Sequence, residues 1–211
     1  MPEVKTAIWS VVHAERHALI QDLEDLTPQQ WSVASLCDGW TVHDVLAHLI
    51  DTAKTTRIGF ARRLIAARFD FDRDNAVGVV RERHGEPDRT LAAFRKVVEH
   101  TSTPPAPLAT RLVEAFAHGE DIRRPLGIHR DYPPSHVAKA IRYQAKTSES
   151  FGGGKERARG CRLVATDVDL QIGDGDEVHG TAIALLLALS GRPTDSTELS
   201  GPGIPALVRR R

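Results

Sequence analysis

Apolar side chains recur every three or four residues over most of the first half of the chain, which is the spacing of amphipathic helices. Proline, glycine or capping residues bound most of the segments that show this pattern. The predicted helices cover Val4–Leu26, Thr41 to about Arg68, a stretch beginning at Pro87, and Leu108–Leu126. Four long helices joined by loops indicate a helix bundle.

The pattern changes after a further predicted helix at Ser135–Phe151. Gly152–Gly154 is interpreted as a flexible linker, because no strand precedes it and the Lys-Ser/Thr ending of a phosphate loop is missing. Two short strands, a tight turn and a buried helix are predicted beyond it, at Cys161–Thr166, Val168–Ile172, Gly173–Asp176 and Thr181–Leu189. The sequence therefore predicts a mainly α protein, with a helical bundle at residues 1–151 and a small α/β region at residues 152–211.

Composition narrows the class of protein. The net charge is zero, which argues against a nucleic-acid surface, and the basic run Arg209–Arg211 is too short to change this. Cys37 and Cys161 are the only cysteines, so a reducing cytoplasm is favoured over a disulfide framework. No apolar run reaches the ~18 residues of a membrane span, and charged residues from Glu3 onward exclude a signal peptide. We expect a cytoplasmic protein with neither nucleic acid nor membrane as partner.

Three side chains on two predicted helices suggest a metal site. Glu114 and His118 are four residues apart and share one helix face, and His48 lies on a second helix. Imidazole and carboxylate ligands suit zinc and related divalent ions, and three protein ligands leave one position open for water or substrate. Asp121, three residues after His118, is a competing ligand. Because Glu-x-x-x-His is common on helices, a surface pair or a buried, hydrogen-bonded histidine is the alternative interpretation.

Two other arrangements compete with this site. His13 and His17 are also four residues apart, but they flank the predicted apolar stripe, which favours a solvated edge. Cys37 lies near His43 in sequence, as in cysteine–histidine nucleophile pairs. Without a third orienting group, a small buried thiol is the default interpretation of Cys37.

Three segments of the sequence resemble the actinobacterial family of mycothiol-dependent maleylpyruvate isomerases and their relatives. The first is Trp31–Leu49, WSVASLCDGWTVHDVLAHL. The second joins Glu114 and His118 to the run Gly119–Gly127, which reads Gly-x-Asp-Ile-Arg-x-x-x-Gly. The third is the apolar run Gly180–Arg192. The resemblance implies a DinB-like four-helix bundle in which His48, Glu114 and His118 bind a divalent metal, usually zinc.

The resemblance also implies an activity. Proteins of this kind are thiol-dependent isomerases or transferases, so mycothiol is the expected cosubstrate and a small electrophilic or anionic molecule the expected substrate. The substrate-binding arginines of the isomerases have no secure match in this sequence. A metal-binding domain without turnover, serving in binding or regulation, is therefore the alternative function. A homodimer is an expected assembly.

Overall fold

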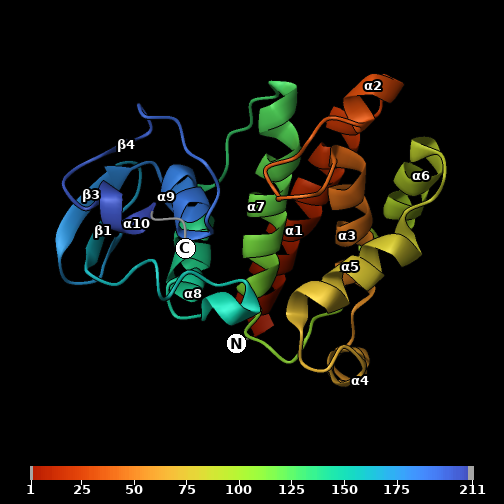
Figure 1. Cartoon of the computed structure of the whole chain (residues 1–211), viewed down its shortest axis with the longest axis horizontal. Helices are drawn as coiled ribbons and strands as arrows, with labels where there is room; N and C mark the ends of the chain where they lie inside the picture. The colour runs from red at the N-terminus through yellow and green to blue at the C-terminus, as the bar shows by residue number, and fades with distance from the viewer. Residues whose placement is uncertain (1, 209–211) are drawn as a thin grey trace. The chain divides into compact units, whose positions relative to one another are not determined.

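The computed structural model describes residues 2–208 (Figure 1). The basic run Arg209–Arg211 lies outside the described residues. The chain forms two compact units, Met1–Arg130 and Asp131–Arg211. None of the helices in the described range combines the length and the apolar character that a membrane span requires.

The N-terminal unit is built around four helices that pack as a bundle (Figure 1). Both α1 and α3 pack against α6 and α7, and their shared core includes Leu46, Ile50 and Phe94, all fully buried. The four helices are α1 (Pro2–Leu23), α3 (Val42–Lys54), α6 (Pro87–Val97) and α7 (Thr110–Arg123). The predicted four-helix bundle is confirmed.

Capping residues determine where the helices that carry the site begin and end. The Thr41 side chain accepts a hydrogen bond from the Asp44 N–H, and Asp44 Oδ2 accepts one from the Thr41 N–H at 2.9 Å, so α3 starts at the predicted capping box. A second capping box, at Thr27, starts the short helix α2 (Pro28–Trp31). Helix α7 continues into a 3-10 turn, Arg124–Leu126, and stops at Gly127, which has a left-handed φ of 70°.

The long helix predicted from Thr41 to about Arg68 is wrong, because it divides into α3 and α4 (Arg57–Ala66). Thr55 and Thr56 between them are extended, and the Thr56 side chain caps α4 by accepting a hydrogen bond from the Gly59 N–H at 3.1 Å. Threonine side chains that bond locally to the backbone compete with helix continuation. The next helix, α5 (Phe71–Glu82), begins after Asp70, whose side chain accepts a hydrogen bond from the Arg73 N–H.

The C-terminal unit combines a four-stranded sheet with helices. The strand order is β2-β1-β3-β4, in which β1 and β3 are parallel and each outer strand is antiparallel to its neighbour. Helix α9 packs on β1, β3 and α8, and nearly all of it is buried. The elements in order are α8 (Pro134–Gln144), η2 (Glu149–Phe151), β1 (Cys161–Ala165), β2 (Gln171–Ile172), β3 (Asp176–Gly180), α9 (Ala182–Leu189), β4 (Leu199–Ser200) and α10 (Ile204–Leu207).

The division between the units differs from the one expected at residues 1–151 and 152–211. The first compact unit ends at Arg130, because α8 packs on α9 through a face that buries Val137 and Ile141. The predicted helix over Ser135–Phe151 is also shorter and stops at Gln144. The C-terminal unit is therefore larger than predicted, while its α/β character agrees with the prediction.

Candidate metal centre

Helices α3 and α7 bring two predicted ligands together in the N-terminal unit. The rings of His48, on α3, and His118, on α7, meet edge to face, with centroids 4.8 Å apart and an interplanar angle of 79°. His48 is buried, and its ring also contacts Trp40, with centroids 5.0 Å apart. Two histidines from separate helices thus share a site that is largely closed to water.

A buried carboxylate holds the His118 ring. Asp121, which is fully buried, has its Oδ2 2.8 Å from His118 Nδ1. The Cys37 thiol donates to the same Oδ2 at 2.9 Å, and its sulfur lies 3.8 Å from His118 Nδ1. Burial lowers the pKa of His118, but the hydrogen bonds with Asp121 and Cys37 outweigh burial and raise it to about 9.

The loop between α2 and α3 carries Cys37 to α7. Its backbone is attached by a hydrogen bond from the Leu36 N–H to the Asp121 carbonyl at 3.2 Å. A turn follows in which the Trp40 N–H donates to the Cys37 carbonyl, and Gly39 within that turn has a φ of 77°. Such a positive φ favours glycine. The loop is thus a defined structure that positions both Cys37 and Trp40.

Glu114, the third predicted ligand, is paired with arginines. Its carboxylate lies 2.9 Å from Arg111 Nη1 and 3.8 Å from Arg16 Nη2, and all three side chains are buried. Arg111 also donates to the Thr52 carbonyl on α3 at 3.2 Å, and Arg16 donates to the His100 carbonyl at 2.9 Å. Glu114 is therefore part of a buried ionic network that connects α1, α3 and α7.

In the described part of the chain, one group of three ligand-type side chains brings its donor atoms within 4.8 Å of one another. It consists of Cys37, His118 and Asp121, so it shares only His118 with the predicted trio. His48 touches this group through its ring contact with His118, whereas Glu114 belongs to the arginine network. The i, i+3 spacing reveals Asp121 in the sequence, but Cys37 reaches α7 only through the tertiary contact of its loop.

The competing histidines have other partners. His13 Nδ1 and His17 Nε2 lie 2.8 Å and 2.7 Å from the two carboxylate oxygens of Glu99, at the edge of the bundle. His43 Nε2 is 2.7 Å from the Thr90 hydroxyl. The structure therefore pairs Cys37 with His118 and Asp121, and not with His43.

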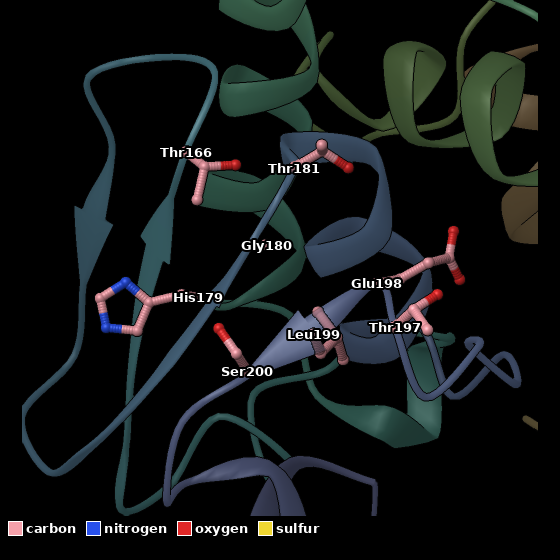
Figure 2. A pocket seen from close by; sticks show the side chains of 8 residues that line it. All are labelled: Thr166, His179, Gly180, Thr181, Thr197, Glu198, Leu199 and Ser200. Carbon is pink, nitrogen blue, oxygen red and sulfur yellow. The ribbon is translucent and has the colours of Figure 1, made fainter.

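The C-terminal unit contains a pocket of about 380 Å³, whose lining residues surround Gly180 (Figure 2). Several of its polar groups serve the fold of this unit. The Thr181 side chain caps α9, the Thr197 hydroxyl donates to Asp195 at 2.8 Å, and Glu198 Oε2 accepts from the Asp195 N–H at 2.7 Å. The lining consists of Thr166, His179, Gly180, Thr181, Thr197, Glu198, Leu199 and Ser200.

Comparison with known protein families gives a match that includes helix α3, which carries the predicted ligand His48. Residues 12–103 match the model of the mycothiol maleylpyruvate isomerase N-terminal domain. The match covers most of the N-terminal unit and less than half of the chain. The matched range includes α3 with His48, and ends before α7 with Glu114 and His118. The family predicted from the sequence is confirmed.

Two solved structures have a similar fold. The mycothiol-dependent maleylpyruvate isomerase is 16% identical, with a TM-score of 0.59, over 94% of this chain and 92% of the isomerase chain. A histidine-to-alanine variant of that enzyme is 15% identical, with a TM-score of 0.61 and the same coverage of both chains. At this level of identity the likeness establishes the DinB-like fold alone. Among curated proteins, none matches the sequence.

Proposed function

We propose that this protein is a metal-dependent enzyme that uses a low-molecular-weight thiol, in particular mycothiol. It either isomerises a small electrophilic or anionic substrate or transfers the thiol onto it. The observation that carries the proposal is the edge-to-face pair of His48 and His118, with Asp121 behind His118. The match of residues 12–103 to the mycothiol maleylpyruvate isomerase N-terminal domain supports a thiol as cosubstrate. A chain with only two cysteines suits the reducing cytoplasm expected from the sequence.

The proposed ligands are His48, Glu114 and His118. Because Asp121 bonds Nδ1 of His118, Nε2 is the ring nitrogen that would bind an ion, after it gives up the proton that the raised pKa leaves on the ring at neutral pH. A carboxylate behind a ligating histidine is the usual arrangement at zinc sites, since it fixes the ring orientation and tautomer. Two imidazoles and one carboxylate suit zinc and leave a coordination position for a thiol.

Glu114 would supply the one anionic ligand. Arg111 and Arg16 lie beside its carboxylate, but a carboxylate oxygen has more than one lone pair and can accept from a guanidinium while it binds an ion. The arginines also anchor Glu114 between helices, which keeps the ligand in place before the ion arrives. The buried cations compensate the charge of a carboxylate that would otherwise be costly to bury.

A divalent ion at this position would lower the pKa of a coordinated thiol and present it as a thiolate. The chain itself contributes the orientation of the ligands and a partly dry environment. Trp40 and the helix bundle limit the access of water to His48, and charge interactions are stronger where water is excluded.

Metal analysis followed by a thiol titration tests this function. The metal-loaded protein should bind mycothiol with release of a proton, which calorimetry in buffers of different ionisation enthalpy detects. His118→Ala should lose both metal and thiol binding, while His17→Ala should retain both. If the loaded protein gives no heat with mycothiol, and a cobalt-substituted sample shows no spectral change, the thiol-dependent function is wrong.

A second candidate function rests on the group formed by Cys37, His118 and Asp121. If these three side chains and His48 held the ion, its coordination would be closed by protein, as in structural zinc sites. The domain would then bind or regulate without turnover. Cobalt–thiolate absorption separates the two functions: the second predicts it before any thiol is added and its loss in Cys37→Ser. The first predicts that it appears only with mycothiol and survives in Cys37→Ser.

A further inference from the structure

The carboxylate of Asp121 lies between His118 and Cys37. Asp121 is fully buried on α7, and a buried carboxylate is costly unless hydrogen bonds compensate it. Its Oδ2 atom lies 2.8 Å from His118 Nδ1 and accepts a hydrogen bond from the Cys37 thiol at 2.9 Å. His118 belongs to the same helix, whereas Cys37 comes from the loop between α2 and α3. The thiol therefore attaches the Asp121–His118 pair to a second part of the unit.

Hydrogen bonds hold the loop that presents Cys37. The Ser35 hydroxyl donates to the Trp40 carbonyl at 2.8 Å and accepts from the Cys37 N–H at 3.1 Å. The Ser35 N–H donates to the same Trp40 carbonyl at 2.9 Å. The Leu36 N–H donates to the Asp121 carbonyl, so the loop contacts Asp121 through its backbone as well as through the thiol. Because its backbone is fixed on both sides, Cys37 has a defined position against the Asp121 carboxylate.

The end of the same loop contacts the other histidine. Trp40 lies against the His48 ring, with centroids 5.0 Å apart. The loop reaches His118 on the neighbouring helix through the Cys37 thiol and the carboxylate that it holds. Side chains behind a ligating histidine lock its ring and so preorganise the site. One loop is therefore placed to fix the edge-to-face arrangement of the two rings.

The position of the thiol at the His118 ring distinguishes a supporting role from ligation. The Cys37 sulfur lies 3.8 Å from His118 Nδ1, which is the same nitrogen that bonds Asp121. The two ring nitrogens of an imidazole point in different directions, and the hydrogen bond at one of them fixes the tautomer for the other. A thiol on the Nδ1 side therefore contacts the carboxylate behind the ring, and not an ion that Nε2 would bind.

We propose that Cys37 is a positioning residue for His118: its thiol holds the Asp121 carboxylate, and that carboxylate fixes the orientation of the ring. A thiol is a weak donor, and serine supplies a hydroxyl donor at the same place, whereas alanine supplies none. Alanine leaves a buried carboxylate with one partner fewer, which favours its movement toward water or another donor. The consequence for metal binding rests on the proposed function, but the orientation of the ring belongs to the metal-free protein as well.

Proton NMR of the metal-free, full-length protein tests the orientation of the ring. In wild type, the Nδ1 proton of His118 should give a downfield signal, because its hydrogen bond to Asp121 slows exchange with water. The signal should be lost in Cys37→Ala and kept in Cys37→Ser. Cys161→Ala is the matched control, since it removes the other thiol, in the C-terminal unit, and should keep the signal. His118→Gln assigns the signal, and circular dichroism checks that each variant is folded.

Zinc affinity measures the consequence at the proposed metal site. Competition with a chromophoric chelator should give a dissociation constant ~10-fold higher in Cys37→Ala, at the lower end of the effect of residues behind the ligands. Cys37→Ser and Cys161→Ala should match wild type.

The outcomes separate this role from the proposed function. An NMR signal that survives in Cys37→Ala, or that is absent from wild type, would overturn the proposal. An unchanged zinc affinity in Cys37→Ala, or a loss of zinc in Cys37→Ser, would overturn it as well. If wild type bound no zinc while the NMR signal behaved as expected, the proposed function would be wrong, and the role of Cys37 in orienting His118 would stand.

Discussion

Two groups of side chains in the N-terminal unit contain the same residue types but differ in the partners of their histidines and of their carboxylate. One is His13, His17 and Glu99 at the edge of the bundle, and the other is His48, His118 and Glu114 inside it. Both show a pair of residues at i, i+4 on a helix. In the first group, each histidine bonds one oxygen of the same carboxylate, so Glu99 joins the two rings.

In the second group the carboxylate of Glu114 pairs with arginines, and the rings of the two histidines contact each other. Arg111 and Arg16 pair with Glu114, while Asp121 forms a hydrogen bond with Nδ1 of His118. The burial also differs, since Glu99 is 63% exposed and Glu114 only 8%. Helical spacing therefore identifies both groups, but the partners of the carboxylate and the exclusion of water distinguish the proposed ligand site from the surface pair.

The largest expected difference between the two groups is in metal content. His118→Ala and His48→Ala should each abolish stoichiometric binding of divalent metal, since two remaining ligands hold an ion poorly. The loss should exceed the ~10–100-fold effect typical of residues behind the ligands. His17→Ala and His13→Ala are the matched controls and should retain the metal. Elemental analysis of the purified proteins after dialysis measures the content. Metal loss in His13→Ala with retention in His48→Ala would reverse the comparison.

The next effect in size concerns the carboxylate that orients His118. Asp121→Asn keeps the shape of the side chain but removes its charge, so metal affinity should fall ~10–100-fold without complete loss. Competition with a chromophoric chelator gives the affinity, and the far-ultraviolet circular dichroism should stay unchanged. The control is Asp22→Asn, whose carboxylate pairs with Arg123 and lies outside the site. If Asp121→Asn removed the metal entirely, Asp121 would be a ligand itself, as the second candidate function requires.

The sequence predicted the architecture of the bundle because its signals are local. The capping box at Thr41 and the apolar stripe that includes Leu46 and Ile50 both act within one helix. Elements that depend on partners distant in the sequence were not predicted. Strand β4, Leu199–Ser200, exists only through its pairing with β3, and α8 belongs to the C-terminal unit only because α9 covers its apolar face.

The same distinction applies to the site. His48 and His118 were predictable because helical spacing places each of them on a helix, and their adjacency follows from the packing of α3 on α7. Cys37 was not predictable as their neighbour, since its position depends on a loop hydrogen bond to the backbone of Asp121. The arginine network around Glu114 depends on Arg16 of α1, which no spacing rule connects with α7. The role of Glu114 as a ligand therefore stays a prediction, which the measurement of metal content tests.

A third histidine separates burial from ligation. His43 is buried and bonded to Thr90, and burial, followed by the nearby positive charge of Arg83, lowers its pKa from 6.5 to about 4. The unfolded chain therefore binds a proton first as pH falls. Stability should decrease between pH 6.5 and 4, at ~1.4 kcal/mol for each pKa unit of the shift. In His43→Gln, the free energy of unfolding from urea titrations should depend less on pH over this range. The exposed His129→Gln should match wild type.

The smallest expected effect belongs to the surface group itself. The hydrogen bond from His17 lowers the pKa of Glu99, so the interaction stabilises the fold above the ordinary glutamate pKa and is lost as pH falls through the lowered value. Because Glu99 is 63% exposed, water and salt screen the charges, and Glu99→Gln should cost less than ~1 kcal/mol at neutral pH. Urea titrations at low and high salt measure this cost, which should shrink as salt increases. Metal content should stay at the wild-type value, because in this group the carboxylate serves only to join α1 to the end of α6. A metal loss in Glu99→Gln would make the surface group a ligand site and remove the distinction between the two histidine clusters.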